Sequence, residues 1–225
     1  MNSLNPDYVL FEDNHLLVVD KPALCVTQGA SPSQPSLLRQ AQHYLKQKYN
    51  KPGNVYLGVV SRLDKTVTGA IVLARTSKAA SRINEQFRQR QVTKIYHALI
   101  PQPLSADSIQ LVDYLRKNDA RHRMEICQKT DSGAKQAVMS LNVLHSYQDM
   151  VHVQLQLETG RKHQIRVQLA HQGSPVAGDR KYGSNIPFQP GIALHSKTLG
   201  LKHPVKDQWL EFEAPLPKSW KSWMT

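Results

Sequence analysis

The 225-residue sequence has little cysteine, few acidic residues and no long apolar run. Its two cysteines, Cys25 and Cys127, lie far apart without a CxxC pair, which predicts free thiols in a reducing compartment rather than a disulfide framework. No apolar run could span a bilayer, and residues 1–7 lack the apolar core of a signal peptide. We therefore expect a cytoplasmic protein that does not enter a membrane.

Several motifs of common enzyme classes are also missing. There is no GxxxxGK[ST] loop and no GxGxxG fingerprint after a strand, so the sequence predicts neither a P-loop NTPase nor a dinucleotide-binding protein. The ten histidines are scattered, without an HExxH or Cys/His cluster, and no metal site is expected. Ser132 and Lys135 form an S-x-x-K pattern, but the companion motifs of β-lactamases are absent.

Basic residues, in contrast, are abundant. The chain carries 29 Lys and Arg against 17 Asp and Glu, a formal net charge of +12 and a sequence pI near 9.8. Such a balance favours a polyanionic partner, for which nucleic acid is the first hypothesis. An acidic membrane surface is the alternative, but it would require a more pronounced basic amphipathic helix. With 40% hydrophobic residues, the composition is that of a globular protein, and we expect one domain over residues 1–225.

Periodicity predicts an α+β protein with a mixed, largely antiparallel sheet and flanking helices. In the first half we expect a hairpin over 8–20, a helix over 37–49 capped by Ser36, a strand–loop–strand unit over 58–75, a helix over 78–91 capped by Ser77, and a strand over 94–100. In the second half we expect short polar strands or loops over 104–135, strands over 137–147 and 150–158, a helix over 161–171, and strands over 175–177, 192–201 and 208–213.

The loop of the strand–loop–strand unit carries a single carboxylate, Asp64, with Arg62 and Lys65 beside it. Between Arg39 and Tyr96 there are 12 Lys and Arg but only two acidic residues. Taken alone, the residues favour a salt-bridge role for Asp64, with a reactive carboxylate as the alternative. The arginines of the helix over 78–91 are equally compatible with a solvated face and with a surface that follows RNA phosphates.

Three blocks, in the same order and register, resemble the motifs of RluA-type RNA pseudouridine synthases. Residues 61–69 (Ser-Arg-Leu-Asp-Lys-x-x-Thr-Gly) are similar to the HRLDxx[ST]G motif, residues 94–98 to KxYxA, and residues 159–171 to the TGRxHQIRxHL block. The segments 12–22, 175–183 and 194–195 continue the resemblance, which extends from about residue 8 to residue 215.

The resemblance implies the pseudouridine synthase fold, with a central catalytic cleft, and the isomerisation of uridine to pseudouridine in RNA without a cofactor. The catalytic aspartate falls on Asp64, which would attack C1′ as a nucleophile or take a proton from C2′. The family's arginine falls on Arg166, expected to pair with Asp64 and hold its pKa low. The tyrosine falls on Tyr96, expected to stack on the extruded uracil and to assist removal of the C5 proton.

The basic residues near these motifs are the expected RNA contacts. We assign substrate binding to Arg62, Lys65, Arg161, Lys162 and His163, with phosphate contacts positioning the RNA. The chain starts too close to its first strand to hold the S4 domain of some relatives, so we expect a catalytic domain alone, acting as a monomer. The target is a ribosomal or a transfer RNA.

Two departures from the family pattern stand out. Ser61 occupies the position of the usual histidine, and Leu24 follows Lys21-Pro22-Ala23 where a glycine is usual. Ser61 motivates the alternative hypothesis, a catalytically silent RNA-binding protein on the same fold. The two hypotheses differ in whether purified protein forms pseudouridine.

Overall fold

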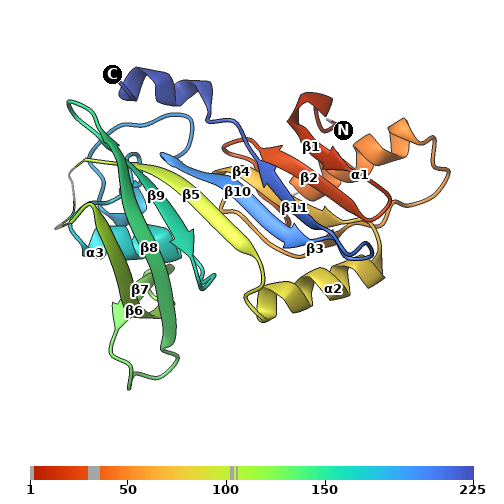
Figure 1. The fold of residues 1–225 in the computed structure, drawn as a ribbon. Coiled ribbons are helices and arrows are strands. Elements are labelled where there is room, and N and C mark those ends of the chain that lie inside the picture. Colours follow the sequence, from red (N-terminus) through yellow and green to blue (C-terminus); the bar gives the residue numbers. More distant parts are fainter. Residues whose placement is uncertain (1–2, 30–35, 102–103, 105) are drawn as a thin grey trace. The chain divides into compact units, whose positions relative to one another are not determined.

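The computed structural model describes residues 3–29, 36–101, 104 and 106–225 and contains seventeen helices and strands in its described parts (Figure 1). The chain divides into two compact units, each of which uses two separate stretches of the sequence. Unit 1 comprises Met1–Thr93 and Ser196–Pro215, and unit 2 comprises Lys94–His195 and Leu216–Thr225. The units are described one at a time.

Unit 1 is built around strands in the order β1-β2-β4-β10, with β3 also pairing with β4 and β11 with β10. The pairs β1–β2, β2–β4, β3–β4 and β10–β11 are antiparallel. The strands are β1 (Val9–Glu12), β2 (Leu16–Lys21), β3 (Gly58–Val59), β4 (Thr68–Ala74), β10 (Leu194–Lys202, which begins in unit 2) and β11 (Trp209–Glu213). The helices are α1 (Leu37–Lys48) and α2 (Ser77–Arg88), and the 3-10 helix η1 (Pro6–Tyr8) precedes β1.

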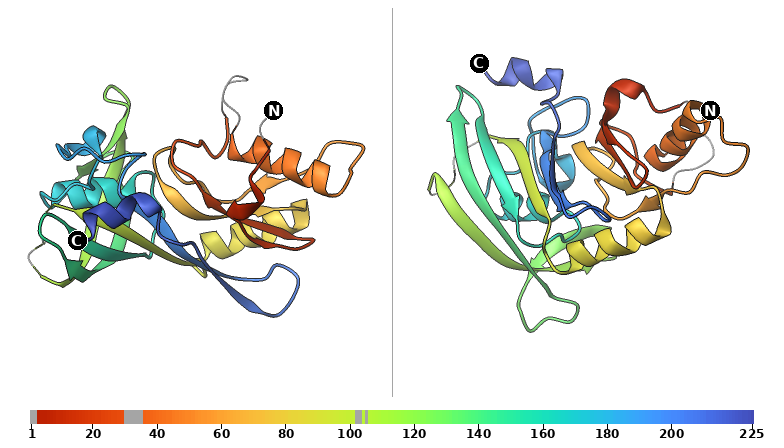
Figure 2. Two further views of the ribbon diagram at one scale, coloured as in Figure 1. Left: turned by 90° about the horizontal axis from the view of Figure 1, so that it is seen from above. Right: turned by 45° about the vertical axis from the view of Figure 1, so that its right-hand side comes forward.

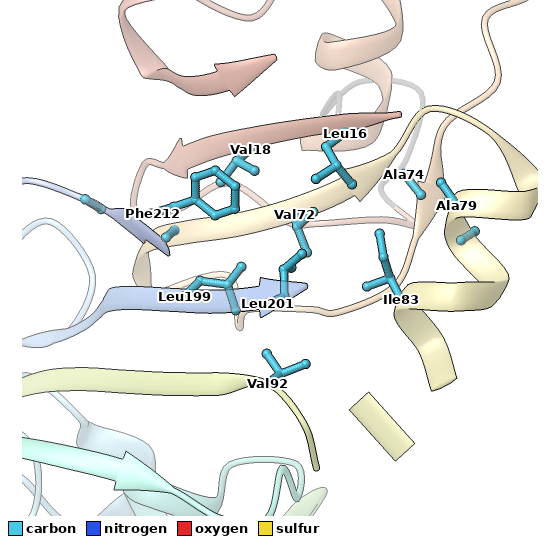
Figure 3. Close-up of a cluster of buried hydrophobic side chains, with 13 residues drawn as sticks. Leu16, Val18, Val72, Ala74, Ala79, Ile83, Val92, Leu199, Leu201 and Phe212 are labelled. Carbon is cyan, nitrogen blue, oxygen red and sulfur yellow. The ribbon is translucent and has the colours of Figure 1, made fainter. Parts of the chain in front are cut away.

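The core of unit 1 forms because β2 and β4 are apolar along almost their whole length. All seven residues of β4 are buried, as expected for a strand covered on both faces. Leu16 and Val18 of β2, Val72 of β4 and Ile83 of α2 belong to one hydrophobic cluster, which Leu199 and Leu201 of β10 and Phe212 of β11 complete (Figure 3). The cluster fixes α2 against the strands that flank the Asp64 loop.

Unit 2 contains an antiparallel run in the order β5-β9-β8-β6-β7. Its strands are β5 (Thr93–Ile100), β6 (Ser108–Asn118), β7 (Arg123–Cys127), β8 (Lys135–Ser146) and β9 (Val151–Leu157), and its helices are α3 (Gln164–His171) and the 3-10 helices η2 (Arg180–Tyr182) and η3 (Lys218–Trp223). Strands β6 and β8 are long and twisted (Figure 2).

Most predicted elements are confirmed, and the α+β class with them. The prediction of short polar strands or loops over 104–135 was wrong, because β6 and β7 pair there as a regular antiparallel hairpin. The residues of β6 are mostly half-buried or exposed, so its apolar alternation is weak in the sequence. Residues 175–177 form no strand, although Ala177 exchanges backbone hydrogen bonds with Leu99 and Ala193.

Two helix starts also differ from the prediction. The N-cap of α2 is Thr76 rather than Ser77, since the Thr76 side chain accepts from the Ala79 N–H. Helix α3 begins at Gln164 rather than at 161, because His163 adopts a left-handed conformation with φ 54°. In contrast, Ser36 caps α1 as expected, accepting from the Arg39 N–H.

The tail, which the sequence leaves unassigned, completes the interior of unit 2. Trp220 of η3 is 1% exposed and makes edge contacts with the rings of His152, His195 and Phe188. His152 of β9 is buried, and its Nε2 lies 3.0 Å from Nδ1 of His97. Burial lowers the pKa of His152, which disfavours its charged form.

In the described part of the chain, no helix is long and apolar enough to cross a membrane. Cys25 and Cys127 are free thiols, as predicted.

Candidate active site

Asp64 lies on the loop between β3 and β4, and its neighbours fix the backbone of that loop. The buried Leu63 makes two hydrogen bonds with Thr27, whose Oγ1 donates to the Leu63 carbonyl (2.9 Å) and accepts from the Leu63 N–H (3.3 Å). The Val67 N–H donates to the Asp64 carbonyl over 3.1 Å and closes a turn. The loop is therefore held through its main chain on both sides of the half-buried Asp64.

A buried lysine, Lys21, also holds the main chain of this loop through hydrogen bonds. Lys21 is fully buried at the end of β2, and its Nζ donates to the carbonyls of Pro22 (2.9 Å), Cys25 (2.8 Å) and Lys65 (3.4 Å). Burial lowers the pKa of Lys21 to about 8, and the neighbouring acidic groups, Asp64 among them, oppose this shift. A positive charge thus lies close enough to Asp64 to interact with it electrostatically.

Steric crowding explains why glycine occupies position 69 at the start of β4. Gly69 has φ +108°, and a Cβ there would lie 2.3 Å from the backbone oxygen of Ser196. Ser196 Oγ donates to the Ala70 carbonyl over 3.0 Å, so β10 lies directly against β4 at this point. No residue with a side chain fits, which explains the glycine at the end of the motif.

Asp20 is a second carboxylate near the loop. Burial raises its pKa to about 6, against the lowering effect of the Lys197 and Lys21 charges. The Gly69 N–H also donates a hydrogen bond to it. Since the pKa of Asp20 is raised, this group titrates close to physiological pH.

Arg62 and Lys65 flank Asp64 in the sequence, and both side chains are exposed. They were predicted to bind substrate. Their exposure leaves them accessible to a polyanion, and the loop then presents one carboxylate with a cation on each side.

Arg166 is the most firmly held of the predicted residues. Its guanidinium makes a bidentate ion pair with Asp179, Nε to Oδ2 at 2.6 Å and Nη2 to Oδ1 at 2.9 Å, with both side chains buried. The Tyr182 ring lies 5.0 Å from the guanidinium carbon, within cation–π range. The expected pair of Arg166 with Asp64 stays a prediction, because these residues belong to different units.

The turn before α3 is organised by Gln164. Its side-chain oxygen accepts from Thr159 Oγ1 (2.8 Å) and from the Arg161 N–H (3.0 Å), and its Nε2 donates to the Val138 carbonyl (3.1 Å). The glutamine thus ties the turn before α3 to Val138 of β8. The polar residues Gln164, Arg166 and Gln168 of α3 are buried, as are the apolar residues Ile165, Val167 and Leu169, so the helix is covered on more than one face.

The predicted RNA contacts in unit 2 surround this turn. Lys162 is exposed, Arg161 is half-buried and donates through Nε to the Gln136 carbonyl (2.9 Å), and His163 Nδ1 lies 2.7 Å from the Tyr182 hydroxyl. Tyr96 lies on β5, half-buried and in register with Leu155 of β9.

The structure therefore gathers the predicted residues into two groups. Asp64, Arg62 and Lys65 share one loop of unit 1, and the group in unit 2 comprises Tyr96, Arg161, Lys162, His163 and Arg166. Sequence reasoning missed the supporting residues Thr27, Lys21 and Asp179. The last two stand inside quoted blocks, Lys21-Pro22 and Gly178-Asp179, which was the available signal.

Comparison with known proteins agrees with these observations. The RNA pseudouridylate synthase family matches residues 15–171 of this chain. The chain is 33% identical to the ribosomal large subunit pseudouridine synthase D of Pseudomonas aeruginosa, over 93% of this chain and 68% of that protein. It is 36% identical to the protein of the same name from Nitrosomonas europaea, over 94% of this chain and 62% of the relative.

Solved structures give the same result for the fold. The human RNA pseudouridylate synthase domain containing 4 superimposes with a TM-score of 0.78 at 25% identity, covering 94% of this chain and 89% of that one. The human RNA pseudouridylate synthase domain containing 1 superimposes with a TM-score of 0.71 at 26% identity, covering 93% of this chain and 83% of that one.

The fold and both motif-bearing groups thus define a pseudouridine synthase. The chain belongs to the RNA pseudouridylate synthase family, with the RluA-type motifs, and its enzyme class is that of the isomerases that convert uridine to pseudouridine in RNA. It spans about two thirds of the length of the two curated relatives.

Proposed function

We propose that this protein isomerises uridines of ribosomal RNA and that Asp64 is its catalytic residue. The observation that carries the proposal is the construction of the Asp64 loop. Thr27 and Lys21 hold the main chain on both sides of the carboxylate, while Asp64 itself is half-buried and is flanked in the sequence by the exposed Arg62 and Lys65. A reactive group needs such fixed placement, because its orientation toward the substrate determines the rate.

The chemistry requires one bond to break and one to form. The bond from N1 to C1′ of the uridine breaks, the uracil turns over, and C5 bonds to C1′, while the C5 proton is lost and N1 gains one. An ionised Asp64 would attack C1′ or take the C2′ proton. We assign the removal of the C5 proton and stacking on the base to Tyr96, and a charge-stabilising role to Arg166, as the family motifs imply.

The basic residues of the protein account for RNA binding. The target base is buried in folded RNA and must be extruded, and contacts between the protein and the RNA backbone must offset the free energy of unstacking that base. Arg62, Lys65, Arg161, Lys162 and His163 are the proposed contacts, in a monomeric, cytoplasmic protein. The names of the two curated relatives favour ribosomal over transfer RNA as the target.

The test is pseudouridine formation in RNA from a strain that lacks this gene. Purified wild-type protein should restore pseudouridine at one or a few mapped positions of ribosomal RNA, and Asp64→Asn should abolish this. Asp207→Asn, which removes an exposed carboxylate of the same unit, is the matched control and should retain activity.

Three outcomes decide the proposal. Modification of transfer RNA alone would overturn the choice of target. Full activity of Asp64→Asn would overturn the catalytic assignment. Wild-type protein that binds RNA without forming pseudouridine would favour the silent RNA-binding alternative that Ser61 motivates.

A further inference from the structure

A cluster of aromatic and basic side chains lies where α1 ends, apart from the residues assigned to chemistry. Its centre is the buried carboxylate of Glu12 on β1. This carboxylate accepts hydrogen bonds from Tyr44 Oη (2.9 Å), Lys48 Nζ (2.9 Å), Tyr49 Oη (2.5 Å) and Arg75 Nη1 (3.1 Å). Four donors thus bind the Glu12 carboxylate, two on each oxygen, and its negative charge is balanced by Lys48 and Arg75.

The Tyr49 ring is fixed by this cluster, yet it is open to solvent. The guanidinium of the largely buried Arg75 lies 5.0 Å from the ring centroid, and the ammonium groups of Lys48 and Lys51 lie at 5.7 Å and 6.0 Å. The phenol is anchored on Glu12, but 47% of Tyr49 is exposed. A rigid, half-exposed aromatic ring surrounded by cations loses little entropy when something stacks on it.

The surrounding charge indicates what would stack there. No acidic residue occurs between Asp20 and Asp64, a stretch that includes all of α1 and the loop after it. Lys46, Lys48 and Lys51 are exposed beside Tyr49, and Glu12 is already satisfied. An aromatic ring with lysines around it matches a single-stranded nucleic acid, whose bases stack while its phosphates contact the cations.

We propose that Tyr49, with Lys46, Lys48 and Lys51, forms a second RNA-binding surface, here called the Tyr49 platform, on which an unpaired base stacks. The inference rests on the proposed function for its RNA partner, and it adds a contact that none of the family motifs includes. The platform would bind a loop or bulge of the substrate, which increases affinity for folded RNA that contains unpaired nucleotides.

The test measures binding without catalysis. The probe is a fluorescein-labelled 12-nucleotide oligoadenylate, which contains no uridine and cannot be isomerised, and the reading is fluorescence anisotropy. Tyr49→Leu should weaken binding about tenfold, since stacking on one aromatic ring contributes roughly 1–3 kcal/mol per base. Tyr49→Phe keeps the ring but loses the anchoring bond to Glu12, so it should weaken binding by clearly less than Tyr49→Leu does.

Tyr56 provides a matched control in the same region. It is 51% exposed, and among the described residues no cation lies over its ring. Tyr56→Leu should bind the oligoadenylate as wild type does. A blunt RNA duplex offers no unpaired base along its length, so Tyr49→Leu should bind it normally.

A second variant tests the platform without altering the ring. Lys51→Gln should reduce the slope of log affinity against log salt by about 0.7 for the single strand, the value expected for one lost phosphate contact. Thermal unfolding of each variant shows whether it is folded.

Equal losses for Tyr49→Leu and Tyr56→Leu, an equal loss on the duplex, or an unchanged salt slope for Lys51→Gln would overturn the inference. None of these results bears on whether Asp64 is needed for pseudouridine formation, so the two proposals fail separately.

Discussion

Asp64 and Arg166 are positioned in opposite ways. The Asp64 loop is fixed by main-chain hydrogen bonds from Thr27 and Lys21, and its carboxylate is only half-buried. Arg166 is fixed through its own side chain, which Asp179 holds in a buried bidentate pair. We therefore expect that Asp64 can be replaced with little loss of stability, whereas the side chain of Arg166 is also part of the buried core.

Removal of Asp179 should have the largest effect. Asp179→Ala leaves the buried guanidinium of Arg166 without this carboxylate, and we expect a loss of about 3–5 kcal/mol in the free energy of unfolding, measured with urea. Glu85→Ala breaks the exposed pair with Arg88 and should cost less than about 1 kcal/mol. Equal losses in the two variants would remove the distinction between the buried pair and a surface pair.

Thr27→Val tests the support of the Asp64 loop. The substitution keeps the volume but removes both hydrogen bonds to Leu63, so the unfolding free energy should fall by about 1–2 kcal/mol. Because the loop then loses its fixed orientation, the rate of pseudouridine formation should fall at least about tenfold. Thr27→Ser retains the hydroxyl and should preserve both properties; a rate for Thr27→Val equal to that of Thr27→Ser would contradict this account.

Asp20→Asn gives a pH-dependent effect. The pKa of Asp20 is raised from 3.8 to about 6, so its contribution to stability is present below the unfolded value and is lost as pH rises through about 6. The full shift corresponds to about 3 kcal/mol at pH 7. Solvent screening of this partly exposed group reduces that value, so the variant should be more stable than wild type by about 1–2 kcal/mol at pH 7, and near pH 3.5 the difference should disappear. Urea unfolding at both pH values measures this, and a pH-independent difference would show that burial of the charge is not its cause.

Asp64→Asn should have the smallest effect on stability. The loop is held through main-chain groups of Leu63 and Lys65, and Asn has nearly the size and shape of Asp, so the unfolding free energy should change by less than about 0.5 kcal/mol even if activity is lost. A loss as large as that of Asp179→Ala would mean that Asp64 is also a core ion-pair partner.

The sequence predicted the parts of the site that depend on local pattern. The strand–loop–strand unit around Asp64 is confirmed as β3, loop and β4, because two apolar runs enclose a polar segment. Ser36 capped the helix that the spacing of apolar residues indicated. The roles of Asp64, Tyr96 and Arg166 stay predictions that rest on the motifs.

What could not be predicted depends on tertiary pairing. Thr27 reaches Leu63 across 36 positions of the sequence, and Lys21 reaches Lys65 across 44, so no local pattern reveals either contact. The start of α3 was misplaced because His163 adopts a left-handed conformation, which the spacing of apolar residues does not reveal. Helix α3 also buries the charged side chain of Arg166, and a search of the sequence for an apolar helix face does not detect a buried arginine.

The division of the chain into units has a consequence for synthesis on the ribosome. Unit 1 needs residues 196–215, which supply most of β10 and all of β11, and unit 2 needs residues 216–225, which supply Trp220. A nascent chain that ends before these segments therefore contains two incomplete cores. Both units finish folding only after nearly all of this sequence has left the exit tunnel, and until then β4 and the pocket of Trp220 are surfaces that chaperones would recognise.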